Sequence, residues 1–199
     1  MNKVKFILAS ASPRRRELLD NIGLEFEIEK SDFDESTLQY DGKNPSLYVQ
    51  EMALLKANDV AKKLDKKENK IIISADTMVC MDNKILGKPS DKKDAENMLK
   101  MLSGKEHQVY TGVCVYRLPD GASTTKAEIT NVKFKNLTVD KIKAYVATNE
   151  PMDKAGAYGI QGIGSMLVEK IDGDYFNVVG LPVSMLADIL ENDYNILLF

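Results

Sequence analysis

Residues 6–16 read FILASASPRRR, and this segment decides the predicted fold. An apolar run gives way to small residues, and Pro13 then opens a run of helix formers. The pattern predicts a buried strand followed by a helix, because proline suits the first helical position. Ser12 is placed to accept a hydrogen bond from the free N–H groups of the first turn. Those N–H groups and the positive end of the helix dipole form a seat for an anion.

The basic start of this helix has two interpretations. Arg14, Arg15 and Arg16 oppose the helix dipole, so helix stability alone does not explain them. A phosphate chain bound at the helix start would resolve the conflict. The alternative is a solvated basic first turn with ordinary caps. The rest of the sequence favours the phosphate interpretation.

Apolar runs and apolar helical stripes predict alternating strands and helices along the chain. Strands are expected at 4–9, 24–29, 71–73, 109–118, 124–135, 167–171 and 176–179, with a hairpin over 78–86 that turns at Asp82 and Asn83. Helices are expected after Pro13, over 45–64, after a Ser90 cap, after a Thr138 cap and from Pro182. The sequence therefore predicts one domain over residues 1–199, an α/β fold with a mixed twisted sheet flanked by helices and two lobes with a cleft.

Composition excludes several classes of function. The formal net charge of -3 argues against a general nucleic-acid coat, so any basic site must be local. Cys80 and Cys114 lie in apolar stretches and are interpreted as reduced core residues of an intracellular protein. Residues 1–3 lead directly into a strand-like run, and no apolar run approaches the ~20 residues of a membrane helix. We expect a cytoplasmic protein with neither a nucleic acid nor a membrane as its partner.

Charged residues at the predicted element ends are the candidates for chemistry. Asp76 directly follows a β-branched strand, where it is equally a cap for the next element or a catalytic group. Paired with Glu35 from an acidic turn, it could hold Mg²⁺, which favours carboxylates together with substrate phosphates. Lys88 lies between a glycine and a proline and is expected to face an anion. Spacing alone leaves Lys56 as a solvated helix lysine.

Gln161 lies within the glycine-rich segment 156–164. Glycines allow a backbone to approach a ligand, and an amide offers both a donor and an acceptor, as the edge of a pyrimidine base requires. The alternative is a glutamine whose hydrogen bonds are satisfied within a turn. The segment matches neither the dinucleotide fingerprint nor a P-loop. His107, the single histidine, is interpreted as structural.

Four motifs in order make the chain resemble a known family. Residues 9–15 (ASASPRR), 74–77 (SADT), 87–89 (GKP) and 153–162 (DKAGAYGIQG) resemble the signature blocks of the Maf proteins. These are nucleotide pyrophosphatases that are also described as septum-formation inhibitors. The resemblance runs from the first strand to residues 178–182, which is nearly the whole chain.

The resemblance implies a fold like that of inosine-triphosphate pyrophosphatases. It also implies hydrolysis of a nucleoside triphosphate to the monophosphate and pyrophosphate with Mg²⁺ or Mn²⁺, and it suggests a homodimer. Asp76 matches the proposed proton acceptor, and Glu35 matches an acidic site position that would hold the metal with Asp76. The positions on the phosphate side match Ser10, Arg14, Arg15, Lys56 and Lys88.

Three positions of the resemblance concern the base. Arg15, Thr77 and Gln161 match the positions that mark the subgroup acting on dTTP and UTP. Two other functions remain open at this point. One is a nucleotide-sensing regulator of septum formation, and the other is a pyrophosphatase for non-canonical purine triphosphates.

Overall fold

The computed structural model describes residues 4–82 and 84–198, and its chain divides into two compact units. The long strands β3 (Lys70–Met81), β5 (Glu106–Leu118) and β6 (Ser123–Phe134) each contribute residues to both units. The first unit contains Met1–Asp76, Thr111–Glu128 and Gly180–Phe199, and the second contains Thr77–Tyr110 and Ile129–Val179.

Within the described residues, seven strands form one mixed sheet with the order β2-β1-β3-β5-β6-β7, and β4 pairs with β3 off this path. The strands are β1 (Lys5–Leu8), β2 (Phe26–Ile28), β3 (Lys70–Met81), β4 (Lys84–Leu86), β5 (Glu106–Leu118), β6 (Ser123–Phe134) and β7 (Val168–Asp172). β1 is parallel to β2 and β3, whereas the pairs β3–β4 and β6–β7 are antiparallel. The predicted α/β class with a mixed sheet flanked by helices is confirmed.

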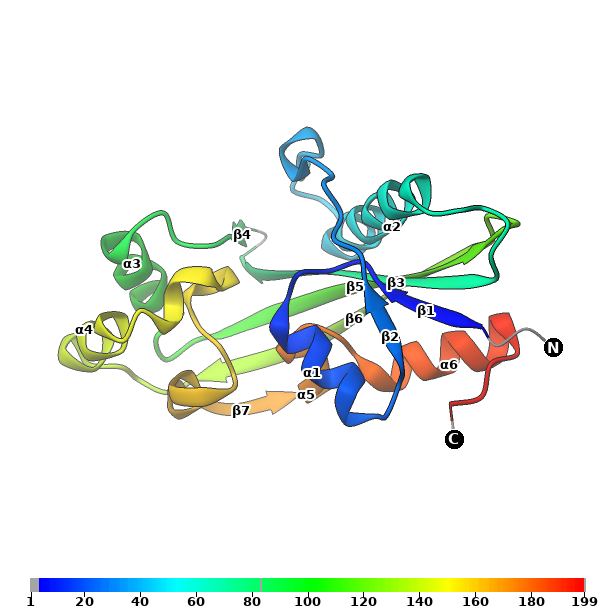
Figure 1. The fold of residues 1–199 in the computed structure, drawn as a ribbon. Helices are drawn as coiled ribbons and strands as arrows, with labels where there is room; N and C mark the ends of the chain where they lie inside the picture. The colour runs from blue at the N-terminus through cyan, green and yellow to red at the C-terminus, as the bar shows by residue number, and fades with distance from the viewer. Residues whose placement is uncertain (1–3, 83, 199) are drawn as a thin grey trace. The chain divides into compact units, whose positions relative to one another are not determined.

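The first unit is built on the predicted strand–helix segment. β1 leads into α1 (Pro13–Asn21), and α2 (Pro45–Lys63) joins β2 to β3. Figure 1 shows α2 on one face of these strands and α1 with α6 (Val183–Tyr194) on the other. Ala53, Ala57 and Val60 of α2 pack with Ile7 and Ile72 in one apolar cluster. The alanines allow the helix to lie close to the sheet, so polar side chains on its edge reach the strands.

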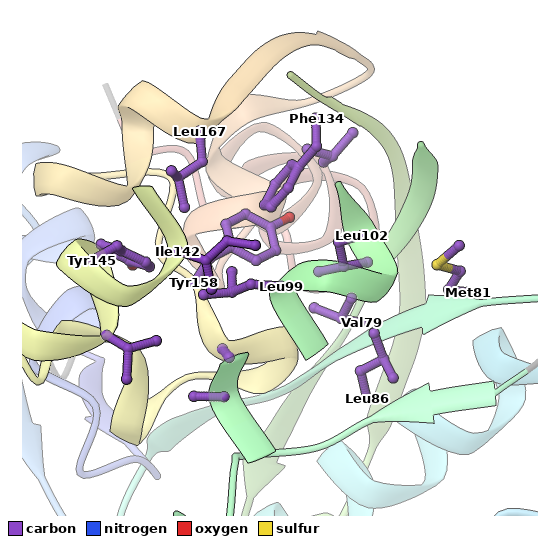
Figure 2. Packing of buried hydrophobic residues seen from close by; sticks show 14 of the residues in the cluster. Val79, Met81, Leu86, Leu99, Leu102, Phe134, Ile142, Tyr145, Tyr158 and Leu167 are labelled. Carbon is purple, nitrogen blue, oxygen red and sulfur yellow. The ribbon is translucent and has the colours of Figure 1, made fainter. Parts of the chain in front are cut away.

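The second unit has a separate apolar core. Its helices α3 (Lys92–Leu102) and α4 (Val139–Ala147) contact one another, as do the short 3₁₀ helices η2 (Glu150–Asp153) and η4 (Gly162–Leu167). Figure 2 shows Leu99 and Ile142 of the two long helices around the ring of Tyr158. This core holds the glycine-rich segment against α4.

Strand β3 is longer than the sequence predicts. The expected central strand ends before Ser74, but β3 continues through Asp76 to Met81, and Asp76 therefore lies inside a strand rather than at its end. The predicted hairpin forms between β3 and β4, with Val79 paired to Leu86. Asp82 adopts a positive φ of 50° at its turn, while Asn83 lies outside the described residues.

The prediction of a strand over 176–179 is wrong. This segment forms the helix α5 (Tyr175–Val179), because the carboxylate of Asp174 accepts a hydrogen bond from the N–H of Phe176 and starts a helical turn. Asn177 is fully buried, and its amide donates to the carbonyl oxygen of Val109 and to Oγ1 of Thr130. These side-chain partners hold a short apolar run as a helix.

Two predicted helix caps are also wrong. Ser12 occupies the N-cap position of α1, but its side chain caps no backbone N–H, and its own N–H donates to Oγ of Ser10 at 3.2 Å. In α3 the cap is Asp91 rather than Ser90, because the Asp91 carboxylate accepts from the N–H of Asp94 at 2.8 Å. Thr138 caps α4 as predicted.

Both cysteines are buried and form no disulfide with each other, as predicted. Among the residues that the structure describes, no helix combines the length and the apolar character needed to cross a membrane.

Candidate active site

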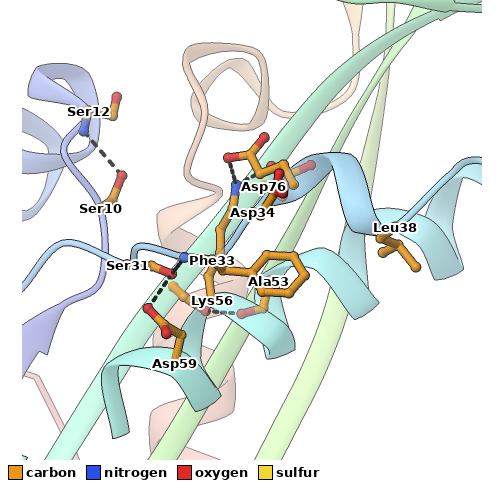
Figure 3. A network of polar contacts seen from close by, with 12 residues as sticks. Ser10, Ser12, Ser31, Phe33, Asp34, Leu38, Ala53, Lys56, Asp59 and Asp76 are labelled. Atoms are coloured by element: carbon orange, nitrogen blue, oxygen red, sulfur yellow. Dashed lines mark hydrogen bonds and ion pairs between the residues drawn. The ribbon is translucent and has the colours of Figure 1, made fainter. Parts of the chain in front are cut away.

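An ammonium group between two carboxylates forms the centre of the candidate site in the first unit. Nζ of Lys56 lies 2.7 Å from Oδ1 of Asp76 and 2.8 Å from Oε1 of Glu35. The Lys56 and Asp76 side chains are only 12% and 14% exposed, whereas that of Glu35 is 63% exposed. Figure 3 shows Lys56 reaching from α2 to Asp76 on β3. Removing Lys56 would leave the mostly buried Asp76 carboxylate without its hydrogen-bonded counter-ion.

The position of Lys56 follows from how α2 is fixed to β3. Oγ of Ser74 donates a hydrogen bond of 2.6 Å to the carbonyl oxygen of Ala53, so the helix and the strand are joined at this level. Lys56 follows Ala53 by one helical turn, and Asp76 follows Ser74 by two residues, on the same face of the strand. The interpretation of Lys56 as a solvated lysine, drawn from spacing alone, is therefore wrong.

Arg15 is held on the same unit at the start of α1. Its Nε donates to the carbonyl oxygen of Gly180 at 2.8 Å, and its Nη1 donates to Oγ of Ser10 at 3.2 Å. Burial lowers the pKa of the Arg15 guanidinium, and the carboxylate of Asp76 opposes this effect by favouring the charged form. The carboxylate of Glu35 acts in the same direction as Asp76. Arg15, Ser10, Asp76 and Glu35 thus belong to one electrostatic neighbourhood, which includes the positive charge of Arg14.

The acidic turn that carries Glu35 is attached to α2 by Asp59. Oδ2 of Asp59 accepts hydrogen bonds from Oγ of Ser31 at 3.0 Å and from the N–H of Asp32 at 2.8 Å. Lys63, one turn further along α2, donates to the Asp32 carboxylate at 2.8 Å. Burial raises the pKa of Asp59, but the hydrogen bonds from Asp32, Ser31 and Lys63 outweigh it and lower that pKa. Figure 3 shows Asp59 beside Ser31.

Sequence reasoning missed Asp59, although a signal was available. Asp59 and Lys63 are spaced i and i+4 on the predicted helix, and both carry charges that can pair with the polar turn. The turn itself is a cap: Asp34 accepts from the N–H of Ser36 and begins the 3₁₀ helix η1 (Glu35–Thr37). Glu35 therefore stands at the first position of a short, capped helix.

The remaining predicted site residues belong to the second unit. Thr77 lies within β3, Lys88 is exposed between β4 and α3, and Gln161 is partly buried directly before η4. The carbonyl oxygen of Gly87, beside Lys88, accepts a hydrogen bond of 3.0 Å from the N–H of Gly156. This hydrogen bond joins the loop that carries Lys88 to the glycine-rich segment that carries Gln161. The roles of Thr77, Lys88 and Gln161 toward a substrate stay predictions.

His107 has a structural environment. It is 2% exposed on β5, and its Nε2 lies 2.7 Å from the hydroxyl oxygen of Tyr158. Its ring also packs edge-to-face against Phe134. Burial lowers the pKa of His107 to about 4. The imidazole is thus neutral at pH 7 and serves the core of the second unit.

The side chains available as metal ligands are few among the described residues. Over residues 4–82 and 84–198, no group of three or more His, Cys, Asp or Glu side chains could hold a metal ion. The predicted pair of Glu35 and Asp76 does converge on one cation, the Lys56 ammonium. Each carboxylate uses one oxygen for that contact and has a second oxygen. Two carboxylates suit Mg²⁺ when substrate phosphates complete the coordination.

Comparisons with known proteins give matches over nearly the whole chain. A family model described as "Maf-like protein" matches residues 5–193. A dTTP/UTP pyrophosphatase of Clostridium novyi (strain NT) is 54% identical over 186 residues, which covers 94% of this chain and 96% of that protein. A dTTP/UTP pyrophosphatase of Thermoanaerobacter sp. (strain X514) is 50% identical, over 97% of this chain and 98% of the relative.

A solved structure has a similar fold. The Staphylococcus aureus Ham1 protein aligns with a TM-score of 0.53 at 15% sequence identity, over 95% of this chain and 99% of its own. At this identity the likeness concerns the fold alone.

Proposed function

Because the chain belongs to the family of Maf-like proteins, we propose that it is a nucleoside triphosphate pyrophosphatase that hydrolyses dTTP and UTP. The products are the nucleoside monophosphate and pyrophosphate. The names of its relatives support the reaction and the substrate class. We place the activity in one domain over residues 1–199 and expect it in the cytoplasm, in keeping with two buried thiols. A homodimer stays a prediction.

The observation that carries the proposal is the charge arrangement around Asp76. A carboxylate that is mostly buried, paired with Lys56 and within the field of Arg15, is positioned for chemistry on an anion. A site that only senses a nucleotide needs cations for the phosphates but has no use for a base among them. This arrangement favours turnover over the alternative of a nucleotide-sensing regulator of septum formation.

We assign the roles as follows. Arg14, Arg15, Lys56 and Lys88 neutralise the phosphate chain, and Ser10 fixes Arg15. Asp76 accepts a proton from a water molecule whose oxygen forms a bond to the α-phosphorus. The bond from that phosphorus to the oxygen bridging the α- and β-phosphates breaks, and pyrophosphate leaves with its electron pair. Such catalysis consists mainly of positioning and charge neutralisation.

Glu35 and Asp76 are the residues that would hold a divalent cation, Mg²⁺ or Mn²⁺, together with phosphate oxygens. When bound, the cation supplies positive charge that neutralises the phosphate oxygens. Lys56 keeps these two carboxylates close together, because one ammonium binds both.

Base selection rests on three positions. Arg15, Thr77 and Gln161 follow the pattern of the pyrimidine subgroup, and the curated relatives are named for dTTP and UTP. The Gln161 amide can pair with a carbonyl beside an N–H, which is the pattern of the uracil and thymine edge. Because 6-oxopurines also show a carbonyl beside an N–H, it is the names of the relatives that favour pyrimidines over the alternative of non-canonical purine triphosphates.

The test is pyrophosphate release from a panel of UTP, dTTP, CTP, GTP and ITP with Mg²⁺ and Mn²⁺ compared. We expect release from UTP and dTTP and a loss of about 10²–10⁴-fold in Asp76→Asn, the usual contribution of a positioned base. The matched control is Asp193→Asn, which alters an exposed residue of α6. Near-native turnover in Asp76→Asn would remove Asp76 from this role, and preferred release from ITP or GTP would favour the purine alternative.

A further inference from the structure

The carboxylate of Glu150 binds the backbone of the glycine-rich segment in the second unit. Its Oε2 accepts a hydrogen bond of 3.1 Å from the N–H of Ile163, and its Oε1 accepts one of 2.9 Å from the N–H of Gly164. Both N–H groups belong to the start of η4, which follows Gln161. The downstream end of the segment is therefore attached to η2, where Glu150 begins the helix.

Tyr145 attaches the upstream end of the same segment. Its hydroxyl donates to Oε1 of Glu150 at 3.0 Å and accepts a hydrogen bond of 3.3 Å from the N–H of Gly159. Tyr145 is 3% exposed on α4, so this hydroxyl is fixed by the apolar core around it. One phenol and one carboxylate thus hold Gly159 on one side of Gln161 and Gly164 on the other.

The glycines at positions 162 and 164 allow the backbone conformation that this attachment requires. A Cβ atom on Gly164 would lie 2.2 Å from the carbonyl oxygen of Gly159 and 2.6 Å from the Tyr145 hydroxyl. Gly162 has a positive φ of 63°, which side chains rarely adopt. The backbone after Gln161 therefore brings Gly164 close to Gly159 and to the Tyr145 hydroxyl, with no room for a side chain at position 164.

The tip of the segment, directly after Gln161, lies outside the apolar core. Gly162 and Ile163 are exposed, and the Gln161 side chain caps no backbone N–H of η4. The hydrogen bonds to Glu150 and Tyr145 give this turn a defined conformation. The residue within it is Gln161, whose side-chain amide is expected to contact the base. Fixing that residue in advance reduces the entropy lost on binding.

We propose that Glu150, supported by Tyr145, is a positioning residue that sets the conformation of residues 159–164 and so orients Gln161 toward the pyrimidine base. The proposal rests on the pyrimidine pyrophosphatase activity proposed above. Glu150 touches no reacting atom; it acts through the backbone on both sides of Gln161. Its loss affects recognition of the base and leaves the chemical step unchanged.

The test combines Glu150→Gln, Tyr145→Phe and Gln161→Ala with steady-state kinetics on UTP and GTP. In Glu150→Gln an amide faces a backbone N–H, and one accepting oxygen is lost. We expect KM for UTP to rise about tenfold with kcat within about twofold, which corresponds to the loss of one or two hydrogen bonds. The preference for UTP over GTP falls by the same factor.

Two matched controls separate this role from general destabilisation. Tyr110→Phe removes another hydroxyl of the second unit, which donates to Gln108 outside the segment. Glu96→Gln neutralises a carboxylate of α3 that pairs with Lys93 and Lys100. Both controls are expected to keep the native KM and the native preference for UTP.

The decisive measurement is the double variant. If Glu150 acts through Gln161, then Glu150→Gln adds less than about twofold to KM in the Gln161→Ala background, because the coupled group is already gone. A full tenfold effect in that background overturns the proposal. Hydrogen exchange of the Ile163 and Gly164 amides in the free protein gives an independent readout, and it rises in Glu150→Gln if the attachment exists in solution.

The outcomes separate the two proposals. A wild-type protein that releases no pyrophosphate from UTP or dTTP defeats the proposed function and with it the role given to Glu150. An active wild type with unchanged KM in both Glu150→Gln and Tyr145→Phe defeats only the role of Glu150. Unchanged exchange at Ile163 and Gly164 likewise contradicts the attachment itself.

Discussion

Lys56 shows how one side chain links stability to the proposed chemistry. It donates to two carboxylates from a position that is only 12% exposed, so its removal leaves Asp76 mostly buried without its counter-ion. We predict that Lys56→Met lowers the free energy of unfolding by about 2 kcal/mol, the scale of a lost hydrogen bond to a charged group. Turnover of UTP falls as well, because Glu35 and Asp76 then repel each other.

The measurement for Lys56 is urea unfolding followed alongside pyrophosphate release. Lys62→Met is the control, because Lys62 is exposed on the same helix. Equal stabilities of the two variants would show that the ion pairs of Lys56 contribute nothing to folding.

Because His107 is buried, we predict that it lowers the free energy of unfolding when the pH becomes acidic. Burial lowers its pKa from 6.5 to about 4, so between these values the unfolded chain binds a proton that the folded chain does not. The contribution of the neutral imidazole is complete above pH 6.5 and is lost as the pH falls towards 4. A difference of this size corresponds to about 3 kcal/mol. Within the described part of the chain, Nδ1 of His107 has no hydrogen-bond partner. An N–H at that position in the imidazolium would therefore have no acceptor.

The single histidine makes this prediction easy to isolate. We expect wild-type protein to lose about 3 kcal/mol more than His107→Gln when unfolding is measured at pH 7 and again near pH 4. The carboxylates titrate in both proteins and cancel in the comparison. Parallel pH profiles would mean that the folded state accommodates the imidazolium.

At the scale of elements, the sequence correctly predicts those helices and strands whose apolar residues form a recognisable pattern within the segment itself. The stripes of α2 and α3, the β5–β6 hairpin and the strand before Pro13 all form as expected. Each is marked by an apolar stripe or an apolar run within its own segment, and that local pattern does not depend on distant partners.

The two wrong predictions about strands share one cause, which is a polar residue whose hydrogen-bond partners come from elsewhere in the fold. Ser74 and Asp76 look like a strand end, but α2 supplies Ala53 as an acceptor and Lys56 as a counter-ion, so β3 continues. Asn177 makes its bonds to β5 and β6, which hold an apolar run as a helix. The candidate site follows the same rule. Its residue types can be identified from the sequence, but the hydrogen bonds by which Asp59 attaches the acidic turn to α2 depend on tertiary contact.

The packing of α2 on β5 yields a prediction for a whole element. A Cβ atom on Gly112 of β5 would lie 2.2 Å from the carbonyl oxygen of Val49 and 2.7 Å from the backbone nitrogen of Gln50. These are backbone atoms, so α2 itself must shift. We predict that Gly112→Ala destabilises the protein by about 3 kcal/mol, at the upper end of overpacking effects.

Thermal unfolding with circular dichroism measures this effect. Gly87→Ala is the matched control, because nothing lies within 4 Å of its added Cβ atom. Since α2 carries Lys56, we also expect Gly112→Ala to lower turnover in the fraction that remains folded. A midpoint for Gly112→Ala equal to that of Gly87→Ala would contradict the close contact of α2 with β5.

At the scale of the whole molecule, substrate binding raises the free energy of unfolding, because a ligand that binds only the folded state shifts the folding equilibrium. The proposed inactive variant Asp76→Asn allows UTP itself to be used without turnover. At a concentration of about 100 times Kd, UTP with Mg²⁺ adds about 2.7 kcal/mol.

For a chain of 199 residues, this free energy corresponds to a rise in Tm of about 5–10 °C. GTP at the same concentration is expected to shift Tm less, because the proposed substrates are the pyrimidine nucleotides dTTP and UTP. The net charge of -3 means that unspecific attraction of triphosphates is weak, so a UTP effect reports a local site. If GTP and UTP shift Tm equally, the cations hold the phosphates but the glycine-rich segment does not read the base.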